Sequence, residues 1–207
     1  MKKAGILGGT FDPIHKGHIA LAENSLKKFG LDYIIFVPTG MPPHKNKRPL
    51  ASKKHRLKMV EEIVKKNPKF KLYKGEINRP GYSYAVDTFS RLKKRFGKST
   101  KLYYIMGLDS INSILNWKKP LELFKLCEFI VATRPNAKIK TFKRLIKFPP
   151  INANKEKIHL FEMHVHISST EIRNRIKLGK KISKFVPKPV ENYIKKFSLY
   201  KTAKERK

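Results

Sequence analysis

The stretch GGTFDPIHKGH, residues 8–18, follows a short apolar run near the start of the chain, and it decides the fold. Gly8 and Gly9 carry no Cβ atom, so backbone N–H groups there can come close to a ligand. Asp12 and Pro13 favour a turn, which takes the chain out of a strand before a helix begins. The stretch therefore predicts a strand, a turn and a helix start, an arrangement suited to binding an anion.

Two histidines, His15 and His18, stand three residues apart where this helix is expected to begin. That spacing places both imidazoles on the same side of a helical turn, near the N-terminus where anions are favoured. A neutral imidazole donates one hydrogen bond and an imidazolium two, so a polyphosphate is expected to favour the charged form. The alternative is an ordinary polar loop. The P-loop pattern GxxxxGK[ST] and the dinucleotide pattern GxGxxG do not fit the stretch.

The composition indicates a folded domain with an unusual charge. The 207 residues are 40% hydrophobic and 11% aromatic, which is adequate for the core of one domain. Lysine and arginine number 48 against 15 Asp and Glu, and the net charge of +33 attracts polyanions such as nucleotides and nucleic acid. Because the lysines are spread through nearly every segment, a solvated lysine-rich surface explains them at least as well as a binding stripe.

No segment predicts a membrane span or a secretion signal. The longest apolar runs, such as 33–37 and 129–132, have the length of strands, and residues 4–11 are too short and too glycine-rich for a signal-peptide core. The single cysteine, Cys127, cannot form an internal disulfide and is interpreted as a small buried residue. We expect a cytoplasmic protein whose basic tail, about 200–207, frays.

Short apolar runs alternate with helical patterns along the chain. Continuously apolar strands separated by helices indicate a doubly wound α/β fold, with a parallel sheet covered on both faces, over a single domain, 1–207. Ligands of such sheets bind beyond the carboxyl ends of the strands, where residues 8–18 begin. Strands are expected at 3–8, 32–38, 70–77, 101–106, 127–133 and 159–165. Helices are expected at 17–29, after Ser52 with Leu57, Val60, Ile63 and Val64 on it, at 84–96, at about 110–126 with a break near Pro120, from about 169, and after Pro187.

A second polar cluster, ISSTEIR at residues 167–173, lies near the end of the chain. Ser168 and Glu171 fit the S-x-x-E capping box, which predicts a helix start and would by itself account for the serines. Arg173 stands in the first turn, where a cation is unfavourable unless an anion binds. We therefore expect amides, hydroxyls and a guanidinium to hold phosphate oxygens here.

The two motifs resemble the HxGH and ISSTxIR signatures of the nucleotidyltransferase superfamily of adenylyl- and cytidylyltransferases, which implies a Rossmann-like fold. Within that superfamily the chain is similar to the bacterial nicotinate mononucleotide adenylyltransferases, from Gly5 to about Tyr200. Phosphopantetheine adenylyltransferases are less similar, since they are usually shorter and carry Thr at the position of His15. The segments that carry the closer resemblance are Pro42–Lys45, Tyr82–Thr88, Gly107–Asp109 with Trp117 downstream, and Thr133–Pro135.

The resemblance implies transfer of the AMP part of ATP, with Mg²⁺, to nicotinate mononucleotide, giving nicotinate adenine dinucleotide and pyrophosphate in NAD biosynthesis. The mononucleotide phosphate attacks the α-phosphorus in line and no covalent enzyme intermediate forms, so the protein mainly aligns two polyanions. No residue is assigned as a metal ligand. The resemblance makes His15, His18 and Arg173 catalytic, places ATP on Gly8, Gly9, Thr10, Phe11, His15, His18, Gly107, Asp109, Ser168, Ser169, Thr170 and Arg173, and places the mononucleotide on His44, Lys45, Tyr84, Ala85, Asp87, Thr88, Trp117 and Arg134.

Three of these assignments have a structural alternative. Lys45 follows a stiff Pro-Pro and suits the mononucleotide phosphate, but it is also one lysine among many. Trp117, the only tryptophan, either stacks on the pyridine ring or belongs to the core. Asp109 either faces the nucleotide beyond a strand end or caps a helix.

The substrate is less well determined than the reaction. The family usually has Thr where this chain has Ala85, a position associated with the nicotinate carboxylate, although backbone N–H groups at 84–86 can still hold a carboxylate. Nicotinamide mononucleotide or another phosphate acceptor is therefore an alternative. A basic nucleic-acid-binding protein is a more distant alternative, and the sequence contains no recognisable DNA- or RNA-binding motif. Weak nonspecific polyanion binding can accompany catalysis, and a homo-oligomer is left open.

Overall fold

The structure, a computed structural model, describes residues 1–43, 50–135, 137 and 139–201. A six-stranded sheet in the order β3-β2-β1-β4-β5-β6 forms its centre, and every neighbouring pair is parallel. The doubly wound parallel sheet predicted from the sequence is thereby confirmed. The strands are β1 (Lys2–Gly9), β2 (Tyr33–Pro38), β3 (Phe70–Leu72), β4 (Thr100–Gly107), β5 (Glu128–Thr133) and β6 (Ile158–Glu162).

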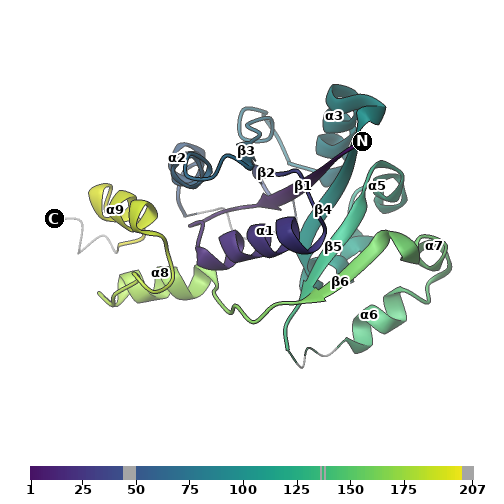
Figure 1. The fold of residues 1–207 in the computed structure, drawn as a ribbon. Helices are drawn as coiled ribbons and strands as arrows, with labels where there is room; N and C mark the ends of the chain where they lie inside the picture. The colour runs from purple at the N-terminus through teal and green to yellow at the C-terminus, as the bar shows by residue number, and fades with distance from the viewer. Residues whose placement is uncertain (44–49, 136, 138, 202–207) are drawn as a thin grey trace.

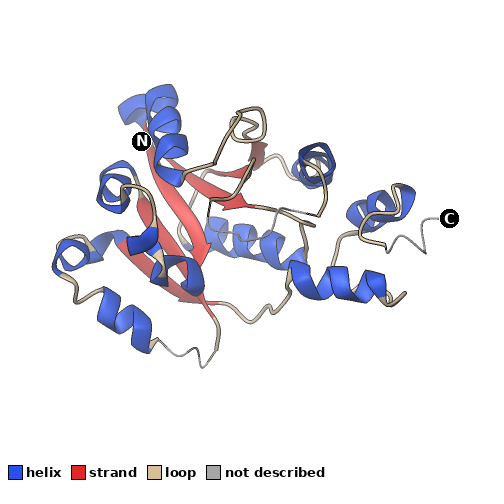
Figure 2. Cartoon of the chain, turned by 180° about the vertical axis from the view of Figure 1, so that it is seen from behind, coloured by secondary structure: helices blue, strands red, loops and turns tan. Residues whose placement is uncertain are grey.

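Helices cover both faces of this sheet, as the two opposite views in Figures 1 and 2 show. Buried residues of α1, α2, α8 and α9 share one core cluster, and those of α3 to α7 share the other. Among the described residues no helix is long and apolar enough to cross a membrane. The helices are α1 (Lys16–Lys28), α2 (Lys53–Val64), α3 (Ala85–Phe96), α4 (Leu108–Asn112), α5 (Pro120–Leu126), α6 (Lys140–Leu145), α7 (Pro149–Asn152), α8 (Ser169–Lys177) and α9 (Lys188–Lys196), with 3₁₀ turns η1 (Gly97–Ser99), η2 (Ile114–Asn116) and η3 (Lys155–Lys157).

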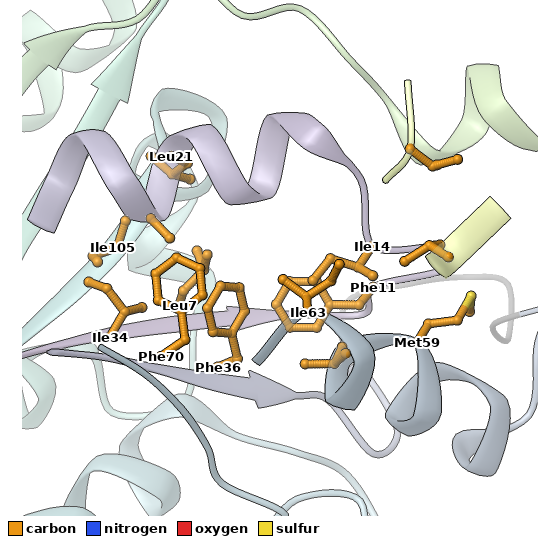
Figure 3. Close-up of a cluster of buried hydrophobic side chains, with 14 of the residues drawn as sticks. Leu7, Phe11, Ile14, Leu21, Ile34, Phe36, Met59, Ile63, Phe70 and Ile105 are labelled. Carbon is orange, nitrogen blue, oxygen red and sulfur yellow. The ribbon is translucent and has the colours of Figure 1, made fainter. Parts of the chain in front are cut away.

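The central strands alternate their side chains between the two cores. On β1, Ile6 packs into the cluster beneath α3 to α7, whereas Leu7 packs into the cluster beneath α1 and α2. Figure 3 shows the second cluster, in which Leu7 and Phe36 of the sheet lie near Ile63 of α2. Both faces of β1 are thus buried, which is why its sequence is a continuous apolar run.

The order of the strands creates a crevice between β1 and β4. From β1 the chain proceeds to β2 and then β3 on one side, and it returns to the other side of β1 for β4, β5 and β6. The connections after β1 and after β4 therefore diverge at the carboxyl edge of the sheet. The start of α1 and the start of α4 both lie at this edge, and they form the walls of the site described below.

The predicted element bounds differ from the structure in three places. The strand expected over 70–77 ends at Leu72, because the following residues turn through hydrogen bonds such as that from Asn78 N–H to Lys74 O (3.1 Å). The strand expected over 159–165 ends at Glu162, and the next residues cross to α8. Helices α6 and α7 were not predicted from the sequence. Cys127 is buried as expected, and desolvation raises the pKa of its thiol.

Candidate active site

His15 and His18 cap the start of α1 reciprocally. The backbone N–H of His18 donates to Nδ1 of His15, and the backbone N–H of His15 donates to Nδ1 of His18, both at 3.3 Å. The two rings stack with their centroids 3.6 Å apart. Because each Nδ1 accepts a hydrogen bond, the donating nitrogen of each neutral ring is Nε2.

His15 is neutral in this arrangement. Its side chain is buried, and desolvation lowers its pKa from 6.5 to about 4 against an opposing contribution from its backbone hydrogen bond. Without a bound anion this ring is therefore neutral, since burial disfavours its charged form. That a polyphosphate favours the imidazolium remains a prediction from the sequence. His15 can still offer one Nε2–H donor to a phosphate oxygen.

The larger of two pockets at the carboxyl edge, with a volume of about 490 Å³, lies at the crevice between β1 and β4. His15 and His18 line one wall, Gly107 and Asp109 line another, and Arg134 follows the end of β5. Asp109 is exposed and is not a helix cap, because Gly107 is the N-cap of α4. The other lining residues are Gly17, Leu21, Leu108, Asn112, Ala132, Thr133, Ala137, Met163, Val165 and Ile167, none of which was singled out from the sequence as a site residue.

Arg134 lines the larger pocket. Sequence reasoning grouped Arg134 with the mononucleotide residues, but it lines the same pocket as the two histidines and Asp109. The sequence could not show this, because the side of the crevice that a strand-end residue faces depends on the order of the strands in the sheet.

The second motif packs directly against the turn after β1. Ser169 Oγ donates to Pro13 O (2.9 Å), and Arg173 Nη1 donates to Asp12 O (2.7 Å). Ser168 caps α8 by accepting from the backbone N–H of Glu171 at 3.1 Å, so the predicted helix cap is confirmed. The two distant motifs are therefore in contact. The contact lies beside the larger pocket, and Ile167 is the one residue of the second motif that lines this pocket.

Thr170 completes this contact by accepting a hydrogen bond from Arg173 Nη2 at 3.1 Å. Both arginine nitrogens named here are therefore engaged by protein atoms. In this arrangement Arg173 fixes the turn rather than extending into the pocket. The sequence indicated a cation in the first turn of a helix, but it could not indicate which acceptor the cation would find.

The residues before the histidines support the site from beneath. Gly8 and Gly9 end β1, and a Cβ atom on Gly9 would lie 2.9 Å from the ring of Phe11. Phe11 is 1% exposed and meets the ring of His18 edge-on, with 5.0 Å between centroids. Figure 3 shows Phe11 among core side chains. The predicted contact of Phe11 with ATP therefore does not involve an exposed ring, and none of Gly8 to Phe11 lines either pocket.

The smaller pocket, of about 130 Å³, lies beside the start of α3. Tyr84 and Ala85 line it together with Trp117, whose Nε1 donates to Ser113 Oγ at 3.3 Å. Trp117 is thus a half-buried ring that both lines the cavity and packs against the core. No side chain caps α3, so this end of the helix favours an anion. The pocket is also lined by Thr39, Pro42, Pro43, Ser83, Tyr104 and Lys118, which the sequence did not single out as site residues.

Among the described residues, Asp87 and Thr88 were also expected to contact the mononucleotide, and neither lines this pocket. Thr88 is buried and donates to Glu76 Oε1 at 2.6 Å. Asp87 forms an ion pair with Lys118, with 3.3 Å between Nζ and Oδ2. His44 and Lys45 lie outside the described residues.

Sequence reasoning also missed Arg56, the largest of the fully buried side chains. Its Nη1 donates to Thr10 O and Thr39 O, both at 2.7 Å, and its Nη2 donates to Gly40 O at 3.0 Å. Desolvation lowers the pKa of this guanidinium, and the nearby charge of Asp12 opposes that effect. The sequence did indicate that Arg56 is buried, because Arg56 falls on the apolar stripe of α2 that continues with Met59, Val60 and Ile63.

Asp12, whose negative charge acts on the nearby Arg56, is held at the turn by three donors. Its carboxylate accepts from Leu50 N–H (2.9 Å), Ala51 N–H (3.1 Å) and Tyr200 O–H (2.8 Å). Asp12 is 5% exposed. The turn that precedes the two histidines is therefore held from α2, from the segment before α2 and from the end of the chain.

A parallel α/β sheet with two histidines at the first helix start and a Ser-Ser-Thr helix start beside them is the arrangement of a nucleotidyltransferase. The family model described as cytidylyltransferase-like matches residues 6–175. A probable nicotinate-nucleotide adenylyltransferase of Thermoanaerobacter sp. (strain X514) is 43% identical, over 98% of this chain and 96% of the relative. One of Moorella thermoacetica is 40% identical, over 96% and 92%. The chain belongs to the cytidylyltransferase-like family and, within it, to the nicotinate-nucleotide adenylyltransferases.

A solved structure shows the same fold. The Plasmodium falciparum nicotinic acid mononucleotide adenylyltransferase complexed with NaAD superposes with a TM-score of 0.75, at 22% identity, over 97% of this chain and 98% of that one. At this identity the likeness concerns the fold.

The neutral His15 makes stability depend on pH. Because its pKa is lower in the folded chain (about 4) than the ordinary 6.5, its contribution is complete above 6.5 and is lost as the pH falls toward 4. The shift corresponds to about 3 kcal/mol. In His15→Asn, which keeps an N-cap acceptor but cannot titrate, the free energy of unfolding should fall by about 3 kcal/mol less over this range. Urea titrations at several pH values test this, and parallel curves for the two proteins would contradict it.

Removing the Arg56 guanidinium should destabilise the fold strongly. Arg56→Met leaves the carbonyls of Thr10, Thr39 and Gly40 without this donor and removes the positive charge near Asp12. We expect a loss of about 3–5 kcal/mol in the free energy of unfolding by urea denaturation, because each buried acceptor left without a donor costs about 1–3 kcal/mol. Arg91→Met, on the exposed side of α3, is the matched control and should change it by about 0.5 kcal/mol or less. A loss below about 1 kcal/mol in Arg56→Met would refute this role.

Proposed function

We propose that the chain transfers the AMP part of ATP to nicotinate mononucleotide, producing nicotinate adenine dinucleotide and pyrophosphate for NAD biosynthesis. The supporting observation is the pair of pockets at one edge of the sheet: a large one with two imidazoles, a carboxylate and a guanidinium, and a small aromatic one. The names of the relatives at about 40% identity support the same reaction.

In the proposed complex ATP occupies the larger pocket, with its phosphates at the start of α1. The Nε2–H of His18 contacts the α-phosphate as charge develops on it, and His15 contacts the triphosphate. Thr10, Ser168 and Thr170 are proposed to assist. For Ser169 and Arg173 to do so, their side chains must exchange the bonds to Pro13 O and Asp12 O for bonds to phosphate oxygens.

The acceptor is proposed to enter the smaller pocket, with its pyridine ring against Trp117 and its carboxylate toward the uncapped start of α3. Its phosphate then points toward the α-phosphorus of ATP, and pyrophosphate leaves in line. No protein nucleophile is needed, so the catalytic contribution is alignment and compensation of the repulsion between two polyanions.

We propose that Mg²⁺ arrives with ATP. Among the described lining residues of the larger pocket, Asp109 is the one carboxylate. One carboxylate together with phosphate oxygens and water is a donor set that suits Mg²⁺, whose charge would offset that of the triphosphate. A cytoplasmic location, weak binding of other polyanions and a homo-oligomer remain predictions from the sequence.

The reaction can be tested directly. Purified protein mixed with ATP, Mg²⁺ and nicotinate mononucleotide should yield the dinucleotide and pyrophosphate in equal amounts, measured by chromatography and a pyrophosphate assay. Replacing ATP by CTP should give little product. Turnover with CTP, or with a different phosphate acceptor in preference to the mononucleotides, would assign the chain to another reaction of the superfamily.

His18→Ala separates catalysis from binding. The variant should lose turnover by about a hundredfold or more, because a donor that acts on the transition state is missing. ATP affinity, measured by calorimetry, should stay within about tenfold. His159→Ala is the control, since His159 lies on β6 and lines neither pocket. Near-normal turnover in His18→Ala would remove the proposed role.

A further inference from the structure

Lys118 supplies a cation to the smaller pocket that neither signature motif contains. It lines the cavity next to Trp117, and its Nζ lies 4.5 Å from the centroid of the Tyr84 ring, another lining residue. Among the lining residues that the structure describes, Lys118 is the one with a charged side chain. The same cavity wall carries Ala85, which has no polar side-chain group.

The ammonium of Lys118 is held loosely. Its second partner is the carboxylate of Asp87, at 3.4 Å from Oδ1 and 3.3 Å from Oδ2. The side chains are 43% and 36% exposed, and an ion pair this open to water is weak. The ammonium can therefore turn from Asp87 to an anionic group of a ligand without losing a strong interaction. The ring of Tyr84 restricts where it can go, because a cation is attracted to the ring face.

The two pyridine mononucleotides differ at one place, where nicotinate carries a carboxylate and nicotinamide carries a neutral amide. A positive charge at the pocket attracts the first and gains little from the second. The chain therefore has a means of choosing nicotinate that does not require a hydroxyl at position 85. Specificity of this kind is a difference between two affinities and does not require a change in the chemical step.

We propose that Lys118 is a specificity-determining residue that favours nicotinate over nicotinamide mononucleotide, and that Asp87 moderates this preference. The inference rests on the proposed function. Two substitutions distinguish an effect of the charge from an effect of the ion pair on the structure. Lys118→Met and Asp87→Asn break the same ion pair, but the first makes the surroundings of the pocket less positive and the second makes them more positive. A purely structural ion pair predicts the same change in both variants.

The test is the ratio of kcat/KM for nicotinate mononucleotide to kcat/KM for nicotinamide mononucleotide. In Lys118→Met we expect the ratio to fall about tenfold, through a higher KM for nicotinate mononucleotide with kcat little changed. Lys118→Arg keeps the charge and should restore most of the ratio. In Asp87→Asn the ratio should stay at or above that of the unmodified chain. Lys119→Met is the matched control and should leave the ratio unchanged, because Lys119 pairs with Glu122 and does not line the pocket.

Two results would overturn the proposal. One is a ratio in Lys118→Met within about twofold of the unmodified chain, and the other is a fall of the ratio in both Lys118→Met and Asp87→Asn. Either result differs from a failure of the proposed function, in which the unmodified chain makes neither dinucleotide. Thermal unfolding of each variant shows that the comparison is made between folded proteins.

Discussion

The buried guanidinium of Arg56, which donates to three backbone carbonyls beside the turn after β1, is the constraint on which the site depends. The turn after β1 must leave the sheet and place two histidines at a helix start, yet its backbone carbonyls are buried and need donors. Arg56 satisfies Thr10 O together with Thr39 O and Gly40 O, so one side chain of α2 joins the ends of β1 and β2. A buried guanidinium is costly by itself, and the nearby carboxylate of Asp12 makes it tolerable.

The geometry of the histidines follows from that turn. Once the turn is fixed, the two imidazoles can cap each other's backbone, which uses both Nδ1 atoms and assigns the donating role to Nε2. Phe11 packs against His18 from the core side and restricts its ring. The donors are thus set before a substrate arrives, which is what stabilisation of a developing charge requires. The C-terminal motif contributes by clamping the same turn through Ser169 and Arg173.

The two pockets differ in their lining groups, and each set of groups suits a different substrate. The larger pocket carries imidazole, carboxylate and guanidinium groups suited to a nucleoside triphosphate, and the smaller one carries rings suited to a flat heterocycle. The large positive charge of the chain attracts nucleotides in general. Discrimination between nicotinate and nicotinamide mononucleotide therefore has to come from local groups such as Lys118.

The sequence by itself determined the alternation of strands and helices outside α6 and α7, the parallel sheet, the cap at Ser168 and the two nucleotide motifs, because periodicity and capping act over a few residues. Only the tertiary structure decided that Arg173 reaches Asp12, 161 positions away, that Arg134 shares a pocket with the histidines, and that Thr88 is buried against Glu76. The role of Arg56 was visible only as a charge on an apolar stripe. These outcomes depend on the strand order and on which buried acceptors find a donor, and both are properties of the packed chain as a whole.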